Sequence, residues 1–187
     1  MKLSKFLLAF FLLNSFNLSK AEPNDILELL HLPEHYALIR HALAPGTGDP
    51  SNFDLDDCKT QRNLSATGRK QSVTMGDLLR EHGIEDAEIL SSQWCRCKET
   101  AEYLRLGKVR EFPALNSFFG RPQKKSPQLK ALHTWFKTHT KTKPTLLVTH
   151  QVVITALTGV FPASGEMVVI KVDTDGDIKV MGRLKTL

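Results

Sequence analysis

Hydrophobic and polar positions along the chain form short blocks that are typical of alternating strands and helices. Continuous apolar runs that stop at a polar loop indicate strands buried in a parallel sheet. Such runs predict strands over residues 36–41, 87–93, 109–112 and 145–150. Apolar residues at helical spacing, bounded by capping residues, Gly or Pro, indicate helices. They predict helices over residues 25–31, 65–82, 96–106, 128–139 and 152–157.

The C-terminal part has the pattern of a hairpin. Residues 166–172 and 178–184 are apolar runs that flank an Asp-rich turn with an Asp-Gly pair. Strands that alternate with helices and end in a hairpin predict an α/β fold, a three-layer α/β/α sandwich around a largely parallel sheet. We find no internal repeat and no low-complexity tract.

The N-terminal residues have the pattern of a secretory signal peptide. Two lysines precede the apolar run 6–13, and small residues stand at the two positions that signal peptidase reads. We therefore expect residues 1–21 to be removed by cleavage between Ala21 and Glu22. The alternative is a membrane anchor, but the run is shorter than the ~20 apolar residues that a span needs. The sequence thus predicts a periplasmic protein without a stable membrane span after cleavage.

Cleavage would leave one domain, residues 22–187, that is close to neutral. It removes Lys2, Lys5 and Lys20 and no acidic residue, so the formal net charge falls from +5 to +2. Such a charge gives no reason to expect nucleic-acid binding. The basic stretch 121–130 is more typical of a solvated loop than of a partner site.

The chain has three cysteines, and in an exported protein an odd number suggests one disulfide and one free thiol. Cys95 and Cys97 stand too close together to pair without strain, so we expect Cys58 to pair with one of them. Cys97 is preferred, since Cys95 is expected to face the core. Two alternatives remain open. One is a metal site on the Cys-x-Cys motif, although no His stands at a familiar zinc spacing; the other is three buried free thiols.

Basic and imidazole side chains follow three of the predicted strands. Arg40 and His41 end the first predicted strand, His150 ends the strand over residues 145–150, and Arg96 stands just past the strand over residues 87–93. Because the carboxyl ends of parallel strands meet at one edge of a sheet, these side chains are expected to converge. Arginine binds phosphate oxygens through paired N–H donors. One such histidine alone is more often structural, but the set of four predicts a site for a tetrahedral oxyanion.

These motifs resemble those of the histidine phosphatase superfamily, whose members are phosphoglycerate mutase-like. Arg40-His41-Ala42 is similar to the family's Arg-His-Gly signature. The other matches are the helix start at residues 64–72, the Ser-x-x-x-Arg-x-x-x-Thr-Ala pattern at residues 92–101 and the second-histidine motif at Thr149-His150. The resemblance extends from about Tyr36 to Ile170 in the family's order, and it is specific as a set.

The resemblance implies a phosphatase that needs no metal and no cofactor. His41 would attack phosphorus as a neutral imidazole and form a phosphohistidine that water then hydrolyses. Arg40, Arg96 and His150 would hold the phosphoryl oxygens, where charge accumulates in the transition state. Arg62, in the loop that varies within the family, is a further candidate for substrate binding, with a plain surface arginine as the equal alternative.

The sequence departs from the family at the proton donor. Gln151 stands where the acid-phosphatase branch has Asp, and Asn116 and Ser117 stand where the mutase branch has Glu. Four loop aspartates are possible substitutes, and the sequence does not choose among them: Asp49, Asp54, Asp56 and Asp57. Without a donor, the enzyme would favour substrates with good leaving groups.

Within the superfamily, the segments "DCKTQRNLS" and "SSQWCRCKETA" look most like a branch of small exported members. That branch includes the lipopolysaccharide core heptose-phosphate phosphatase of bacterial envelopes. It implies a phosphorylated small molecule or an envelope glycan as substrate. Two hypotheses from other classes remain: a noncatalytic protein that binds phosphorylated glycans, and an envelope protein that binds metal through its cysteines.

Overall fold

The computed structural model describes residues 25–186, so the signal peptide predicted over residues 1–21 lies outside the described part. The helices are α1 (Asp25–Glu28), α2 (Ala66–Glu81), α3 (Cys95–Leu104), α4 (Lys125–Thr138) and α5 (Gln151–Thr158). The strands are β1 (His35–Arg40), β2 (Glu88–Ser91), β3 (Val109–Glu111), β4 (Thr145–Thr149), β5 (Met167–Val172) and β6 (Ile178–Leu184). Within this range no helix is both long and apolar enough to cross a bilayer.

The six strands form one sheet in the order β3-β2-β4-β1-β5-β6. The first four are parallel to one another, while β5 pairs antiparallel with β1 and β6 antiparallel with β5. This confirms the predicted α/β class with a largely parallel sheet and a closing hairpin. Because β1, β2 and β4 are parallel neighbours, their carboxyl ends lie at the same edge of the sheet.

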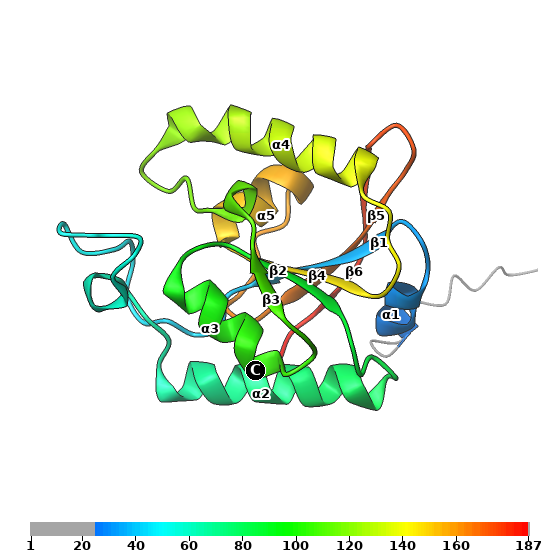
Figure 1. Cartoon of the computed structure of the whole chain (residues 1–187), viewed down its shortest axis with the longest axis horizontal. Coiled ribbons are helices and arrows are strands. Elements are labelled where there is room, and N and C mark those ends of the chain that lie inside the picture. The colour runs from blue at the N-terminus through cyan, green and yellow to red at the C-terminus, as the bar shows by residue number, and fades with distance from the viewer. Residues whose placement is uncertain (1–24, 187) are drawn as a thin grey trace, which may run out of the picture.

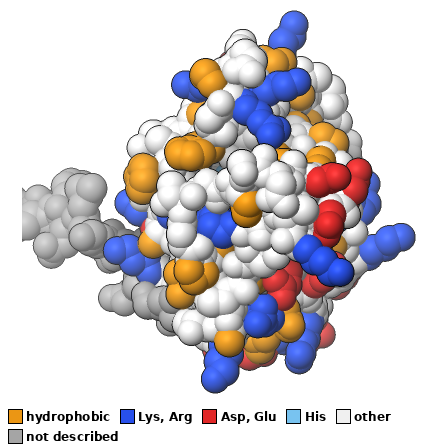
Figure 2. All heavy atoms as spheres, turned by 90° about the vertical axis from the view of Figure 1, so that its left-hand side faces the viewer, with side chains coloured by type: hydrophobic (Ala, Val, Ile, Leu, Met, Phe, Trp, Pro, Cys, Tyr) orange, Lys and Arg blue, Asp and Glu red, His pale blue; other side chains and the backbone are white. Residues whose placement is uncertain are grey.

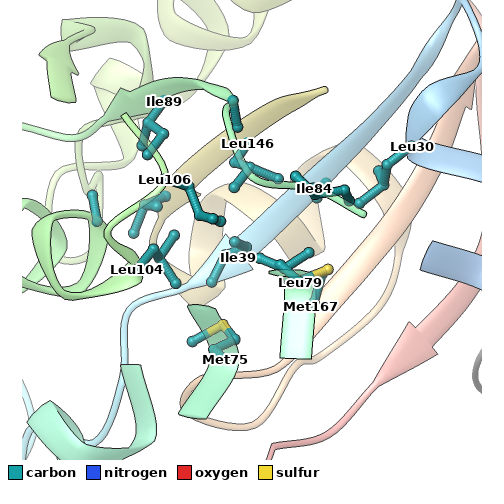
Figure 3. Close-up of a cluster of buried hydrophobic side chains, with 14 of the residues drawn as sticks. Leu30, Ile39, Met75, Leu79, Ile84, Ile89, Leu104, Leu106, Leu146 and Met167 are labelled. Carbon is teal, nitrogen blue, oxygen red and sulfur yellow. The ribbon is translucent and has the colours of Figure 1, made fainter. Parts of the chain in front are cut away.

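Helices cover both faces of the sheet, with α2 and α3 on one side and α4 and α5 on the other (Figure 1). Successive side chains of a strand point to opposite faces, so β1 contributes to both hydrophobic clusters. Ile39 packs in the cluster of Met75 and Leu79 from α2 (Figure 3). Leu38 packs in the cluster of Phe136 from α4. The two buried clusters hold the sheet, and therefore its strand ends, in a fixed position.

One helix begins earlier than the sequence predicts. The expected helix over residues 128–139 starts at Lys125, so Pro127 lies in its first turn. Proline is tolerated there because the first backbone N–H groups of a helix have no partner within it. Pro127 therefore marks the start of the helix rather than the end of the preceding loop.

Glycine lets α2 approach the loop that follows β1. A Cβ added at Gly68 would lie 2.2 Å from the carbonyl oxygen of Leu43, so the close contact requires a residue without a side chain. Ser65, the N-cap of α2, has its Oγ as the acceptor for the Gly68 N–H at 3.0 Å. The start of α2 thereby fixes the backbone two residues beyond His41.

Candidate active site

The structure brings the four predicted residues at the strand ends to one cavity of about 580 Å³. The backbone N–H of His41 donates to the carbonyl of Thr149 at 2.9 Å, which joins the ends of β1 and β4. The ring centroids of His41 and His150 are 5.5 Å apart. In Figure 1 the loop of residues 42–64 projects on the left, and Figure 2 looks onto that side of the molecule.

His41 is held as a neutral imidazole. Its Nδ1 lies 2.8 Å from the carbonyl oxygen of Ala42. Because that oxygen only accepts, Nδ1 carries the proton and Nε2 keeps its lone pair. Burial, followed by the charge of Arg96, holds the pKa of His41 well below its usual value. The imidazole is therefore unprotonated at neutral pH, and its lone pair at Nε2 is available for attack.

His150 is the N-cap residue of α5, and its ring is fixed by a hydroxyl group. Its Nε2 lies 2.8 Å from Ser92 Oγ, which in turn lies 3.2 Å from Asn116 Oδ1. Burial, followed by the charges of Arg96 and His41, holds the pKa of His150 well below its usual value. Sequence reasoning gave Ser92 no role of its own, although Ser92 is the first residue of the Ser-x-x-x-Arg pattern. Asn116, which stands where the mutase branch has Glu, belongs to this hydrogen-bonded group.

Both arginines of the strand ends are fixed by the protein and still have a donor to offer. Arg40 donates from one terminal nitrogen to the carbonyl of Pro162 at 2.8 Å. Arg96 is 3% exposed, and its two terminal nitrogens donate to the Asp49 carboxylate at 2.7 and 3.2 Å. Among the described residues, neither Nε atom has a hydrogen-bond partner, although both are buried. Because these Nε atoms have almost no accessible surface, an anion in the cavity would contact the guanidinium groups through their terminal nitrogens, of which one in Arg40 is bonded to the protein.

Asp49 is the one candidate acid that lines the cavity. The other three lie outside its lining: Asp54, Asp56 and Asp57. The Asp49 carboxylate also accepts from the Trp94 indole at 3.0 Å and from the backbone N–H of Arg62 at 3.1 Å. Burial alone would raise the pKa of Asp49, but the hydrogen bonds from Arg96 and Trp94 and the charge of Arg96 lower it. Asp49 is therefore an ionised acceptor that holds Arg96, not a proton donor in this state.

Arg62 lines the cavity and ties its loop together. Its Nε donates to the carbonyl of Gly48 at 2.8 Å, and a terminal nitrogen donates to the carbonyl of Ala44. These bonds hold residues 44–48 beside the two histidines, and the guanidinium adds positive charge to the cavity. Direct binding of substrate by Arg62 stays a prediction.

The preferred cysteine pairing is wrong, because the disulfide joins Cys58 to Cys95. Cys95 begins α3 and lies within reach of the loop, with 5.7 Å between the two Cα atoms. Cys97 is two residues further, about 200° around the helix, and faces the interior with no exposed surface. Its Sγ lies 3.5 Å from His150 Nε2, and burial raises the pKa of the thiol to about 12. The disulfide ties the loop before Arg62 to the helix that carries Arg96.

This pairing also removes the basis of the cysteine metal site. Two of the three sulfurs are bonded to each other, so they are not available as thiolate ligands. Between residues 25 and 186, no group of three His, Cys, Asp or Glu side chains is arranged to hold a metal ion.

Comparison with known proteins places the fold. No protein-family model matches the chain, and no curated protein sequence matches it significantly. Solved structures do match. Protein histidine phosphatase SixA in complex with tungstate is 18% identical, with a TM-score of 0.57 over 81% of this chain and 97% of its own. Mycobacterial glucosyl-3-phosphoglycerate phosphatase in complex with inorganic phosphate is 14% identical, with a TM-score of 0.53 over 79% and 94%. Mycobacterial hydrolase 1 is 15% identical, with a TM-score of 0.59 over 80% and 97%.

The fold is that of the histidine phosphatases. At these levels of identity the match concerns the arrangement of helices and strands and not the individual side chains. The chemistry of this cavity therefore has to be argued from its own residues.

Proposed function

We propose that the protein is a phosphomonoesterase that acts through a phosphohistidine intermediate and needs no metal ion. The observation that carries the proposal is the state of His41: a buried, neutral imidazole whose Nε2 lone pair faces a cavity lined by arginines. Arg40 and Arg96 line this cavity, and the paired N–H donors of a guanidinium suit the oxygens of a phosphoryl group. The fold, shared with two solved phosphatases, supports the same reaction class.

In the first step the lone pair of His41 Nε2 attacks phosphorus, and the bond between phosphorus and the ester oxygen breaks. Arg40 and Arg96 donate to the phosphoryl oxygens as negative charge accumulates there. The proton on His41 Nδ1 stays on that nitrogen, donated in a hydrogen bond to the Ala42 carbonyl, so the imidazole becomes cationic as the P–N bond forms. That carbonyl stabilises the cation and orients the ring.

In the second step water attacks phosphorus, the P–N bond breaks, and inorganic phosphate leaves with the neutral imidazole restored. The leaving oxygen of the first step also needs a proton. Of the described residues that line the cavity, the one carboxylate is Asp49, which is ionised and occupied by Arg96. Solvent therefore supplies this proton, and turnover favours esters whose leaving group is a weak base.

We place this activity in the cell envelope, as a periplasmic enzyme with a phosphorylated sugar of the lipopolysaccharide core as one possible substrate. The signal-peptide pattern of residues 1–21 supports export. The Cys58–Cys95 disulfide supports an oxidising compartment, because such bonds are rare in the cytosol. The sugar substrate has only the sequence resemblance of the two cysteine-containing segments in its favour.

Turnover of p-nitrophenyl phosphate by His41→Gln, beside the wild type, tests the proposal. We expect the variant to lose at least ~10³-fold in turnover, since it has no nucleophile. The exposed His31 provides a matched control, and His31→Gln should retain the wild-type rate. The wild type should keep its rate in EDTA. Wild-type turnover in the His41 variant, or inactivation by EDTA with recovery in zinc, would overturn the proposal. Phosphate binding by a wild type that hydrolyses no ester would instead identify a noncatalytic binding protein.

A further inference from the structure

Two exposed phenylalanines line the cavity. Among residues 25–186, three large hydrophobic side chains are exposed, and two of them, Phe119 and Phe161, line this cavity. They are 58% and 69% exposed. Single exposed hydrophobic residues are common and need no explanation. A pair at one cavity provides apolar surface whose burial by a ligand is energetically favourable.

The two rings come from loops far apart in the sequence. Phe119 lies between the 3₁₀ turns Pro113–Leu115 and Pro122–Lys124, and Phe161 lies between α5 and β5. The loop of Phe161 is tied to the phosphate site, since the next residue, Pro162, accepts the hydrogen bond from Arg40. The ring of Phe119 lies beside Gly48, in the loop that carries Asp49. Both rings are thus held by the same loops that hold the arginines.

Arg121 adds a charge to this cavity that the phosphate site does not use. Its guanidinium carbon lies 5.5 Å from the ring centroid of Phe53, which stacks on Trp94 with 5.1 Å between centroids. The ion pairs of the described residues do not include Arg121. The aromatic platform positions the cation beside the cavity.

The net positive charge of the cavity lining is larger than the negative charge of one phosphate group. Four arginines line it, against the single carboxylate of Asp49, and both histidines are neutral at pH 7. A phosphomonoester brings a charge of about −1.5 to −2 at this pH. One positive charge is therefore left over, and Arg121 is the exposed arginine of the four. Figure 2 shows basic side chains among hydrophobic and polar groups on this face, with acidic side chains gathered toward one side.

The cavity lining also includes uncharged polar side chains. Thr47, Ser51, Ser117 and Gln151 also line the cavity and provide hydroxyl and amide groups. An aryl group makes no hydrogen bonds with such groups, whereas a sugar presents hydroxyls at its edge and apolar C–H groups on its face. The cavity, at about 580 Å³, has room for a ring beyond the phosphate.

We propose that Phe119, Phe161 and Arg121 form a subsite for the leaving group, and that this group is a sugar ring with a second acidic group. The phenylalanines cover the apolar face of the ring, and Arg121 pairs with the second anion. The subsite rests on the proposed phosphatase activity and names the class of ester on which it acts.

The test compares glucuronic acid 1-phosphate with glucose 1-phosphate, which differ in one carboxylate. We expect the wild type to favour the acidic sugar in kcat/KM, and Arg121→Gln to reduce that preference by about fivefold, because exposed charge pairs are worth little more. The change should appear in KM and should shrink in high salt. Lys124→Gln removes a charge that is also exposed but does not line the cavity, and it should leave the ratio unchanged.

The phenylalanines are tested with the same pair of sugars. Phe119→Ala and Phe161→Ala should each raise KM by about threefold to tenfold, while the inhibition constant of inorganic phosphate, which has no ring, changes less than twofold. Leu32→Ala, the third exposed hydrophobic residue, is the control. Equal kcat/KM for the two sugars, or an unchanged ratio in Arg121→Gln, overturns the acidic-sugar subsite while p-nitrophenyl phosphate turnover still upholds the phosphatase. A larger loss on phenyl phosphate than on the sugars in the phenylalanine variants identifies an aryl ester and also overturns it. If the wild type hydrolyses none of these esters, the proposed function itself is refuted.

Discussion

Replacing Asp49 with asparagine separates two roles that a carboxylate in this cavity can have. The Asp49 carboxylate accepts hydrogen bonds from both terminal nitrogens of Arg96, at 2.7 and 3.2 Å, and from the N–H groups of Trp94 and Arg62. Asparagine has nearly the same shape, but it carries no charge and has one oxygen instead of two. The substitution therefore weakens the hold on Arg96 without opening a cavity.

The magnitude follows from burial. Removing one partner of a buried ion pair costs about 3–5 kcal/mol when the other charge stays buried. The Asp49 side chain is 16% exposed, and the amide oxygen keeps one hydrogen bond, so we expect a loss of about 2 kcal/mol in the free energy of unfolding. Removing one donor to a developing oxyanion costs about 10²–10³-fold in turnover, and Arg96 is loosened rather than removed, so we expect a loss of about 10–100-fold.

The assay compares a good and a poor leaving group, p-nitrophenyl phosphate and an alkyl phosphate. Because Asp49 is ionised and holds Arg96, its replacement should lower kcat for both esters by the same factor, within about threefold. If Asp49 were the proton donor, the alkyl ester would lose a further ~10²-fold or more, since general acid catalysis matters most for poor leaving groups. That selective loss would refute the positioning role. Asp54→Asn, in the same loop but outside the cavity lining, should leave both rates unchanged.

Two further predictions concern the disulfide and the histidines. Reduction of the Cys58–Cys95 bond, or its replacement by Cys58→Ser with Cys95→Ser, should lower the free energy of unfolding by about 3–4 kcal/mol, because it closes a loop of 37 residues. Thermal unfolding measures this, and an unchanged melting temperature would contradict it. The lowered pKa values of His41 and His150 mean that the unfolded chain binds more protons below about pH 6.5, the ordinary histidine value, so stability should fall as the pH drops through it. Each histidine contributes up to about 1.4 kcal/mol per pH unit there. His41→Gln should reduce this slope of unfolding free energy against pH by about half, and an equal slope would show that His41 is protonated in the folded state.

Much of the site could be predicted because its residues follow strands that the hydrophobic pattern reveals. The run before Arg40-His41 and the run before His150 are continuous and apolar, and their burial in a parallel sheet decides where their carboxyl ends lie. The position of Arg96 followed in the same way from the end of β2. In each case the local hydrophobic pattern was enough to predict the strand, and the parallel pairing of the strands brings their carboxyl ends together.

The loop of residues 42–64 could not be predicted, because its contacts are made with distant parts of the chain and it has no periodicity. Asp49 meets Arg96 across 47 positions, and no spacing in the sequence distinguishes Asp49 from the other loop aspartates. The cysteine pairing depended on which side of α3 faces this loop. Cys95 lies on that side and Cys97 on the core side, and this rotation is set by packing against β4 rather than by the residues between them.

Phosphorylation of His41 is the most direct test of the account. The wild-type enzyme is mixed with p-nitrophenyl phosphate, quenched in alkali within milliseconds, and analysed by peptide mass spectrometry under basic conditions that preserve phosphohistidine. We predict one phosphoryl group, carried by the peptide that contains His41. It should be absent in His41→Gln, and its amount should increase when hydrolysis of the phosphohistidine is slowed. Steady turnover with no phosphate on His41 at any quench time, or phosphate on another residue, would contradict the central claim.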